Sequence, residues 1–122
     1  VEDSPDLDGR LRALWSDSLA AQEVDSELWL LLEFELWLHG ARNAEFADRL
    51  AARYADRRRN LAVPLQAWAK DEGIGRLRHP ERTAGLVIAL LLGAAMQQRL
   101  DTEAFSSADV VAGLRSLLEG DT

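Results

Sequence analysis

The sequence has 122 residues, of which 48% are hydrophobic and 29% charged, and its formal net charge is −7. A chain of this length and composition can bury one hydrophobic core, so we expect one folded domain spanning residues 1–122. Because cysteine is absent from the sequence, disulfides, thiolate metal sites and a cysteine nucleophile are excluded. The acidic charge repels phosphate backbones, so these residues are not expected to bind nucleic acid.

We expect no membrane segment, because the longest apolar stretch, Ala84 to Met96, is too short to cross a bilayer. The acidic start, Val1-Glu2-Asp3, lacks the pattern of a signal peptide. A first residue other than Met is typical of a chain cut from something longer, and we expect a cytoplasmic protein.

The hydrophobic pattern predicts five helices and no strand. The first helix runs from about Pro5 to Ala20, with Ser4 as its N-cap. The second runs from about Ser26 to Gly40 and is apolar nearly all round between Leu28 and Leu38. Such a helix is expected to be central and buried.

The third predicted helix follows Asn43 as its N-cap and ends at Gly73. Its apolar residues recur at helical spacing from Phe46 to Trp68. Pro64 falls inside this pattern and removes a backbone donor, so we expect a kink just before it.

The fourth predicted helix, about Pro80–Leu100, follows His79 as its cap and carries apolar residues on two opposite faces. Two apolar faces need two packing partners. The fifth helix begins at Ser106, which forms a capping box with Asp109, and it ends at Gly120.

Three stretches carry the pattern of a known family. Residues 28–37 read LWLLLEFELW, residues 46–73 form a long helix that ends in a glycine turn, and residues 75–84 read GRLRHPERTA before IALLLGAAMQQRLD at 88–101. These stretches resemble the C-terminal domains of TetR-family transcriptional regulators, whose last segment often reads G-x-L-R-x-x-D-P-E-x-x-A … D-G-L-x-x-Q-x-L. His79 and Leu92 stand where that segment often has acidic residues.

The resemblance implies an all-α domain of five helices that senses a small ligand and forms a homodimer through a four-helix interface of its last two helices. In the family, an N-terminal helix-turn-helix binds operator DNA. We find no such motif in these residues, so operator DNA would be bound only by a missing N-terminal part. We therefore expect a transcriptional regulator that acts as a repressor. We expect its ligand to be small and largely apolar or aromatic, and we expect no cofactor.

Trp29, Glu33 and Trp37 lie one helical turn apart on one face of the second helix. They form either a packed core with a satisfied carboxylate or an aromatic pocket with one acid to orient a ligand. A buried Glu33 would need a cation, and Arg57 or Arg58 can supply it. The predicted ligand-binding residues are Trp15, Trp29, Glu33, Trp37, Tyr54, Arg58, Trp68, Leu91 and Ala95.

Gly85, Ala89 and Gly93 form a ridge of small residues on the fourth helix. The ridge packs either against a helix of the same chain or against a second copy, and we favour the second copy. The predicted dimer interface comprises Leu86, Ala89, Leu90, Gly93, Gln97, Val110, Leu114 and Leu117.

The sequence does not favour an enzyme or a metal protein. His39 and His79 show no ligand spacing, and Ser106 and Ser107 are explained as helix caps. No nucleophile, base and orienting group can be assembled from the remaining residues. The alternative to a ligand sensor is a purely structural helical dimerisation module with a filled core and no pocket.

Overall fold

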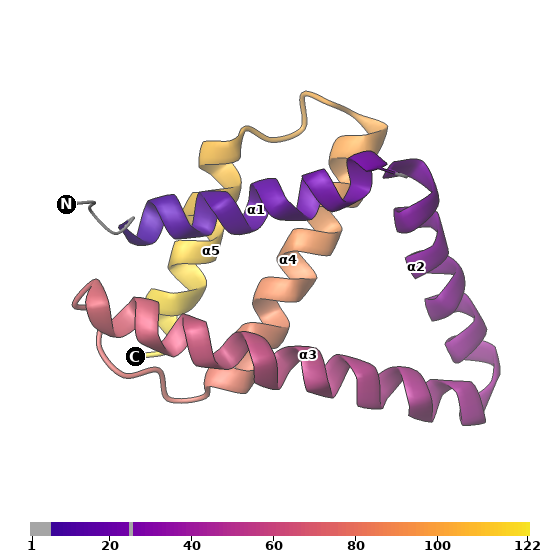
Figure 1. Ribbon diagram of the computed structural model, residues 1–122, viewed down its shortest axis with the longest axis horizontal. Coiled ribbons are helices and arrows are strands. Elements are labelled where there is room, and N and C mark those ends of the chain that lie inside the picture. Colours follow the sequence, from indigo (N-terminus) through magenta and orange to yellow (C-terminus); the bar gives the residue numbers. More distant parts are fainter. Residues whose placement is uncertain (1–5, 25) are drawn as a thin grey trace.

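The computed structural model describes the backbone of residues 6–24 and 26–122 and the side chains of residues 6–17 and 31–122. Its described residues form five α-helices and no strand, which confirms the predicted all-α fold (Figure 1). The helices are α1 (Leu7–Val24), α2 (Ser26–Arg42), α3 (Ala44–Asp71), α4 (Pro80–Leu100) and α5 (Ser107–Gly120).

Helices α1 and α3 run across the molecule, and α2 joins them at one end (Figure 1). Helix α4 crosses from α3 towards α1, and α5 lies beside α4 at the end of the molecule away from α2. The closest packing is between α3 and α4, α2 and α3, α1 and α5, α1 and α2, and α4 and α5. Within the chain α4 packs against α3 and α5, whereas Leu86, Met96 and Leu100 of α4 stay exposed, so only part of its apolar surface finds partners here.

The hydrophobic core lies where α1, α3, α4 and α5 meet. Its largest fully buried side chains are Trp15, Leu7, Leu11, Leu65, Leu77, Leu114, Leu118 and Val87. Each such leucine contributes on the order of 1.5–3 kcal/mol by leaving water. Because Leu7 and Leu11 of α1 and Leu114 and Leu118 of α5 belong to this core, it holds the first and last helices together.

The helix boundaries differ from the prediction at α1 and α2. Helix α1 begins at Leu7 and continues to Val24, past the predicted end at Ala20, and the predicted cap at Ser4 lies outside the described residues. Helix α2 continues through Gly40 to Arg42. It ends there because Asn43 adopts an extended conformation and caps the next helix, its side chain accepting from the Phe46 N–H at 2.9 Å.

Helix α3 runs through Pro64 as one continuous helix, so the proline does not break it. A bend of the helix axis at this point stays a prediction. The helix ends as predicted, with Glu72 as its C-cap and Gly73 at φ 81°, a left-handed conformation that favours glycine.

Both predicted caps of the last two helices are in place. His79 is the N-cap residue of α4, although its side chain makes no capping bond. Its backbone N–H instead donates to the Asp121 carboxylate at 3.0 and 3.1 Å, and the Arg78 N–H donates to the Asp121 carbonyl at 2.8 Å. Ser106 and Asp109 form the predicted capping box of α5. The end of α5 is thus fastened to the start of α4.

An arginine of α5 joins three helices. Arg115 donates to Asp8 of α1 at 2.8 Å, to Glu72 at the end of α3 at 3.2 Å and to Glu119 at 3.1 Å. The Glu72 carboxylate also accepts from the Leu7 N–H at the start of α1. These bonds to three carboxylates raise the pKa of the Arg115 guanidinium above its ordinary value, the bond to Asp8 most of all.

Helix α4 is, contrary to expectation, long and apolar enough to cross a membrane by length and composition alone. The expectation considered only residues 84–96, whereas the apolar composition extends over the whole helix. Its apolar side chains serve the core, since Ala84, Val87, Leu91 and Ala95 are buried in the cluster shared with α1, α3 and α5. A core helix passes the same test, so α4 is weak evidence for a membrane.

Candidate ligand site and dimer face

A polar cluster joins α2 to α3 around a buried carboxylate. Glu33, in the middle of α2, is only 2% exposed. Its carboxylate accepts a hydrogen bond from the Tyr54 hydroxyl and lies 3.4 Å from Nη1 of Arg57. The Trp37 Nε1–H donates to the same Tyr54 hydroxyl at 2.9 Å. The carboxylate therefore has the partners that its burial requires.

Helical spacing explains why these four side chains meet. Glu33 and Trp37 lie one turn apart on α2, and Tyr54 and Arg57 lie three residues apart on α3. The Arg57 guanidinium also lies over the Tyr54 ring, 4.9 Å from its centre. With one carboxylate and one guanidinium, the cluster is electrically balanced.

The cluster changes the acidity of its phenol. Burial raises the pKa of Tyr54 above its ordinary value of 10.0, and the hydrogen bond to Glu33 and the charge of that carboxylate add to the rise. The bond from Trp37 and the charge of Arg57 act in the opposite direction. The hydroxyl is therefore held in its neutral form, in which it can donate.

Aromatic and aliphatic side chains border this cluster. The Trp37 ring makes edge contacts with Phe34 and Tyr54, each with centroids 5.9 Å apart. Trp37 is 40% exposed, and Leu31, Leu32 and Leu38 are about half exposed. The flank of α2 thus combines a satisfied polar centre with apolar surface open to solvent, and the expectation that α2 is central and buried is wrong.

The structure brings together three of the predicted ligand-binding residues, Glu33, Trp37 and Tyr54. Trp15 is instead 1% exposed in the core. Trp68 packs against the same core beneath the Arg10 guanidinium, 5.9 Å from its ring centre. Leu91 and Ala95 are core residues of α4, and the side chain of Trp29 lies outside the described residues.

Of the two arginines considered as partners of Glu33, the structure selects Arg57. Arg58 points to a different neighbour, because its methylene groups pass over Gly85 of α4, where an added Cβ would come within 2.9 Å of its Cδ. Arg57 and Arg58 lie three and four residues after Tyr54, and both spacings place a side chain beside it, so helical spacing alone does not distinguish them.

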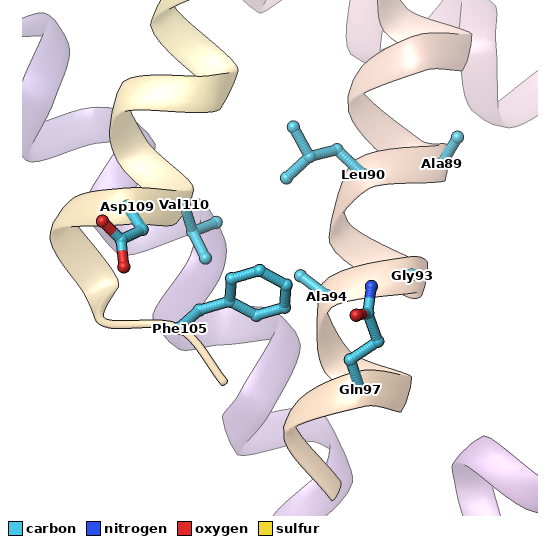
Figure 2. A pocket seen from close by; sticks show the side chains of 8 residues that line it. All are labelled: Ala89, Leu90, Gly93, Ala94, Gln97, Phe105, Asp109 and Val110. Carbon is cyan, nitrogen blue, oxygen red and sulfur yellow. The ribbon is translucent and has the colours of Figure 1, made fainter. Parts of the chain in front are cut away.

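A groove of about 310 Å³ lies between α4 and α5 (Figure 2). Leu90 projects from α4 towards α5, and the Phe105 ring projects from the segment before α5 towards α4. The lining residues are Ala89, Leu90, Gly93, Ala94, Gln97, Phe105, Asp109 and Val110. Outside the groove, two further apolar side chains of α4 reach solvent, with Leu86 55% and Leu100 78% exposed.

The predicted dimer residues fall into two groups. Leu86, Ala89 and Gln97 are exposed, and a Cβ added at Gly93 would meet nothing within 4 Å. Leu90 and Leu117 are half-buried against the core, whereas Val110 and Leu114 are buried inside the chain. A second copy could reach the first group directly.

The ridge of small residues on α4 is divided in the same way. Gly85 makes room for Arg58 of its own chain, while Gly93 faces open space. The same-chain interpretation therefore holds at Gly85, whereas packing of Gly93 against a second copy stays a prediction.

Among the described residues, no three histidine, aspartate or glutamate side chains gather so that they could hold a metal ion. The described side chains instead provide a satisfied buried carboxylate and an exposed apolar face. The fold that carries them is a five-helix, all-α domain.

The sequence matches the family model of the BetI-type transcriptional repressor, C-terminal domain, over residues 8–120. The chain therefore belongs to this family of TetR-type C-terminal domains, as the resemblance implied. Neither a curated protein nor a solved structure matches the sequence.

Proposed function

We propose that this chain is the ligand-sensing and dimerising domain of a TetR-type repressor that acts in the cytoplasm. The family match supports its role in transcription regulation. Operator DNA would be bound by an N-terminal helix-turn-helix outside these residues, since a net charge of −7 disfavours contact with phosphates.

The buried Glu33 cluster is the observation that carries the sensing proposal. Small-molecule sites combine apolar and aromatic walls with a few placed polar groups. Here Trp37 offers an exposed ring, and Tyr54 offers a hydroxyl beside it. Because Arg57 balances Glu33, a neutral, largely apolar or aromatic ligand is the best match for this region.

Sensing would act by shifting the population of two arrangements of α1, α2 and α3. The bonds of Tyr54 to Glu33 and Trp37 tie α2 to α3. A ligand that takes over one of these bonds favours the arrangement in which the helices accommodate it. The change in α2 would then alter the spacing of the DNA-binding parts in the dimer.

Ligand screening by tryptophan fluorescence tests this proposal. A ligand that contacts Trp37 should quench its emission, and both Trp37→Ala and Glu33→Gln should weaken binding. Glu35→Gln is the matched control, because Glu35 lies on the same helix and is exposed. If the two variants fold and bind a screened ligand as tightly as the unaltered chain, the ligand site lies elsewhere.

Dimerisation is supported by the exposed apolar face of α4. Obligate homodimers bury about 2,000 Å² or more in total, and Leu86, Ala89, Gly93 and the groove beside them offer apolar surface for this. Sedimentation at micromolar concentration should show a dimer. A clean monomer under these conditions contradicts the proposal.

The alternative is a structural dimerisation module. It is favoured by Trp15, Leu91 and Ala95, because these predicted ligand-binding residues already pack against other side chains in the core. Such a module has no pocket for small molecules. Failure of the chain to take up a hydrophobic dye would favour it over a sensor.

A further inference from the structure

A separate hollow lies where α3 passes into the linker to α4, at the end of α3 away from α2 (Figure 1). Its volume is about 410 Å³, which falls in the range of small-molecule sites. The residues that line it are Gln66, Lys70, Gly73, Gly75 and Arg76. None of them belongs to the Glu33 cluster.

Two cations line this hollow without a carboxylate partner. Lys70 and Arg76 are exposed, and no carboxylate of the described residues forms an ion pair with either. The neighbouring Asp71 pairs with Arg10 at 3.3 Å, and Glu72 pairs with Arg115 at 3.2 Å. In a chain with 21 acidic and 14 basic side chains, two unpaired cations that line one hollow form a local site of positive charge.

The backbone of the linker adds hydrogen-bond donors. Gly73 and Gly75 have φ of 81° and 113°, so the chain turns sharply here. The N–H groups of Gly73 and Ile74 donate to carbonyls at the end of α3. Within the described part of the chain, the N–H groups of Gly75 and Arg76 have no acceptor.

Gln66 supplies a further donor. Its Oε1 accepts from the Leu77 N–H at 2.8 Å, so the amide nitrogen is the polar group that remains for a ligand. The lining residues also carry carbon surface, namely the methylene groups of Gln66, Lys70 and Arg76 and the α-carbons of the two glycines. The hollow therefore offers donors and carbon surface but no free acceptor side chain.

We propose that this hollow binds a small organic carboxylate, whose anionic group contacts Lys70 and Arg76. The planar guanidinium of Arg76 can hold both oxygens of a carboxylate, and Lys70 adds a point charge. The apolar part of the ligand would lie against the methylene wall. The ligand differs in charge and in place from the neutral molecule proposed for the α2–α3 region.

Binding would fasten the linker to α3. Lys70 belongs to the last turn of α3, whereas Arg76 belongs to the linker. The far end of the linker is already held, because Arg78 and His79 donate backbone hydrogen bonds to Asp121. A ligand that binds only the folded chain raises its unfolding temperature.

Benzoate is a suitable probe, titrated against the chain by calorimetry and thermal unfolding at constant ionic strength. The test variant is Lys70→Gln/Arg76→Gln, and the matched control is Arg12→Gln/Arg53→Gln, which removes two exposed arginines elsewhere. We expect saturable binding of one benzoate per chain and a higher unfolding temperature. The test variant should weaken binding about tenfold or more, because two charge-assisted hydrogen bonds are lost, while the control keeps it.

Four outcomes would overturn the proposal. If benzoate binding does not saturate, or if the test and control variants weaken it equally, benzoate is attracted by the overall charge of the chain and not by this hollow. Binding that the test variant leaves unchanged means a site elsewhere. Inorganic phosphate binding as tightly as benzoate contradicts the carboxylate assignment. Glu33→Gln should leave benzoate binding unchanged, which separates this site from the α2–α3 region.

Discussion

The Trp37 indole and the Tyr54 phenol are joined across α2 and α3 by a hydrogen bond of 2.9 Å, in which Nε1–H donates to the phenol oxygen. The same hydroxyl donates its own proton to Glu33. One hydroxyl of α3 therefore satisfies a donor and an acceptor of α2, and the stability of this contact depends on Tyr54.

Removal of this hydroxyl by Tyr54→Phe should lower the free energy of unfolding by about 1–3 kcal/mol, because the buried carboxylate keeps only Arg57. Urea unfolding measures the change. Trp37→Phe is the comparison and should cost less, since Trp37 is at the exposed edge and leaves the bond to Glu33 intact. An equal or larger loss in Trp37→Phe contradicts this account.

Alkaline titration should reveal the altered acidity of Tyr54. It is the one tyrosine in the sequence, so tyrosinate absorbance reports on this residue alone. Its pKa is raised above 10.0 in the folded chain, so the stability it contributes is fully present below about pH 10 and is lost as pH rises through the folded value.

Glu33→Gln should move this pKa part of the way back towards 10.0, because burial, the largest cause of the rise, remains. Glu35→Gln should leave the pKa of Tyr54 unchanged. A folded chain whose tyrosine titrates at the ordinary value would show that the phenol is not held as described.

Gly93→Leu should separate the proposed dimer without unfolding the chain. A side chain at Gly93 meets nothing within 4 Å in its own protomer, so it would obstruct only a partner. Gly120→Leu is the matched control at another open glycine, near the end of α5. Sedimentation should give a monomer for the first variant and a dimer for the second, whereas a Gly93→Leu dimer of unaltered affinity would place the interface elsewhere.

Leu114→Glu is not a test of the interface, because Leu114 has no exposed surface within the chain. A carboxylate there would be buried without a partner and should unfold the domain. Loss of the dimer in this variant should therefore be accompanied by loss of helical circular dichroism.

Ser106→Ala should lower the free energy of unfolding by about 0.5–2 kcal/mol, as loss of an N-cap does in other helices. Hydrogen bonds from the Ser106 backbone N–H and, to a lesser degree, from its hydroxyl lower the pKa of Asp109 below the ordinary value of 3.8. The stability that this carboxylate contributes is therefore present above pH 3.8 and is lost as pH falls. Acid unfolding of the two chains measures both effects. Ser107→Ala, one residue further, is the control and should change little.

The sequence by itself determined the five helices and most of their ends. Asn43, Gly73 and the box of Ser106 and Asp109 mark helix ends because their side chains and conformations satisfy nearby backbone groups. These are local interactions within a few residues. The end of α1 had no such marker, and there the predicted boundary was wrong by four residues.

The choice of partner among equivalent candidates was decided only by the tertiary structure. Arg57 and Arg58 are adjacent in sequence, yet α2 meets the first and α4 meets the second. Leu114 and Leu86 both lie on apolar faces, yet one is buried within the chain and the other is 55% exposed. Helical periodicity fixes which side chains share a face, whereas the neighbour on that face depends on how helices distant in sequence cross.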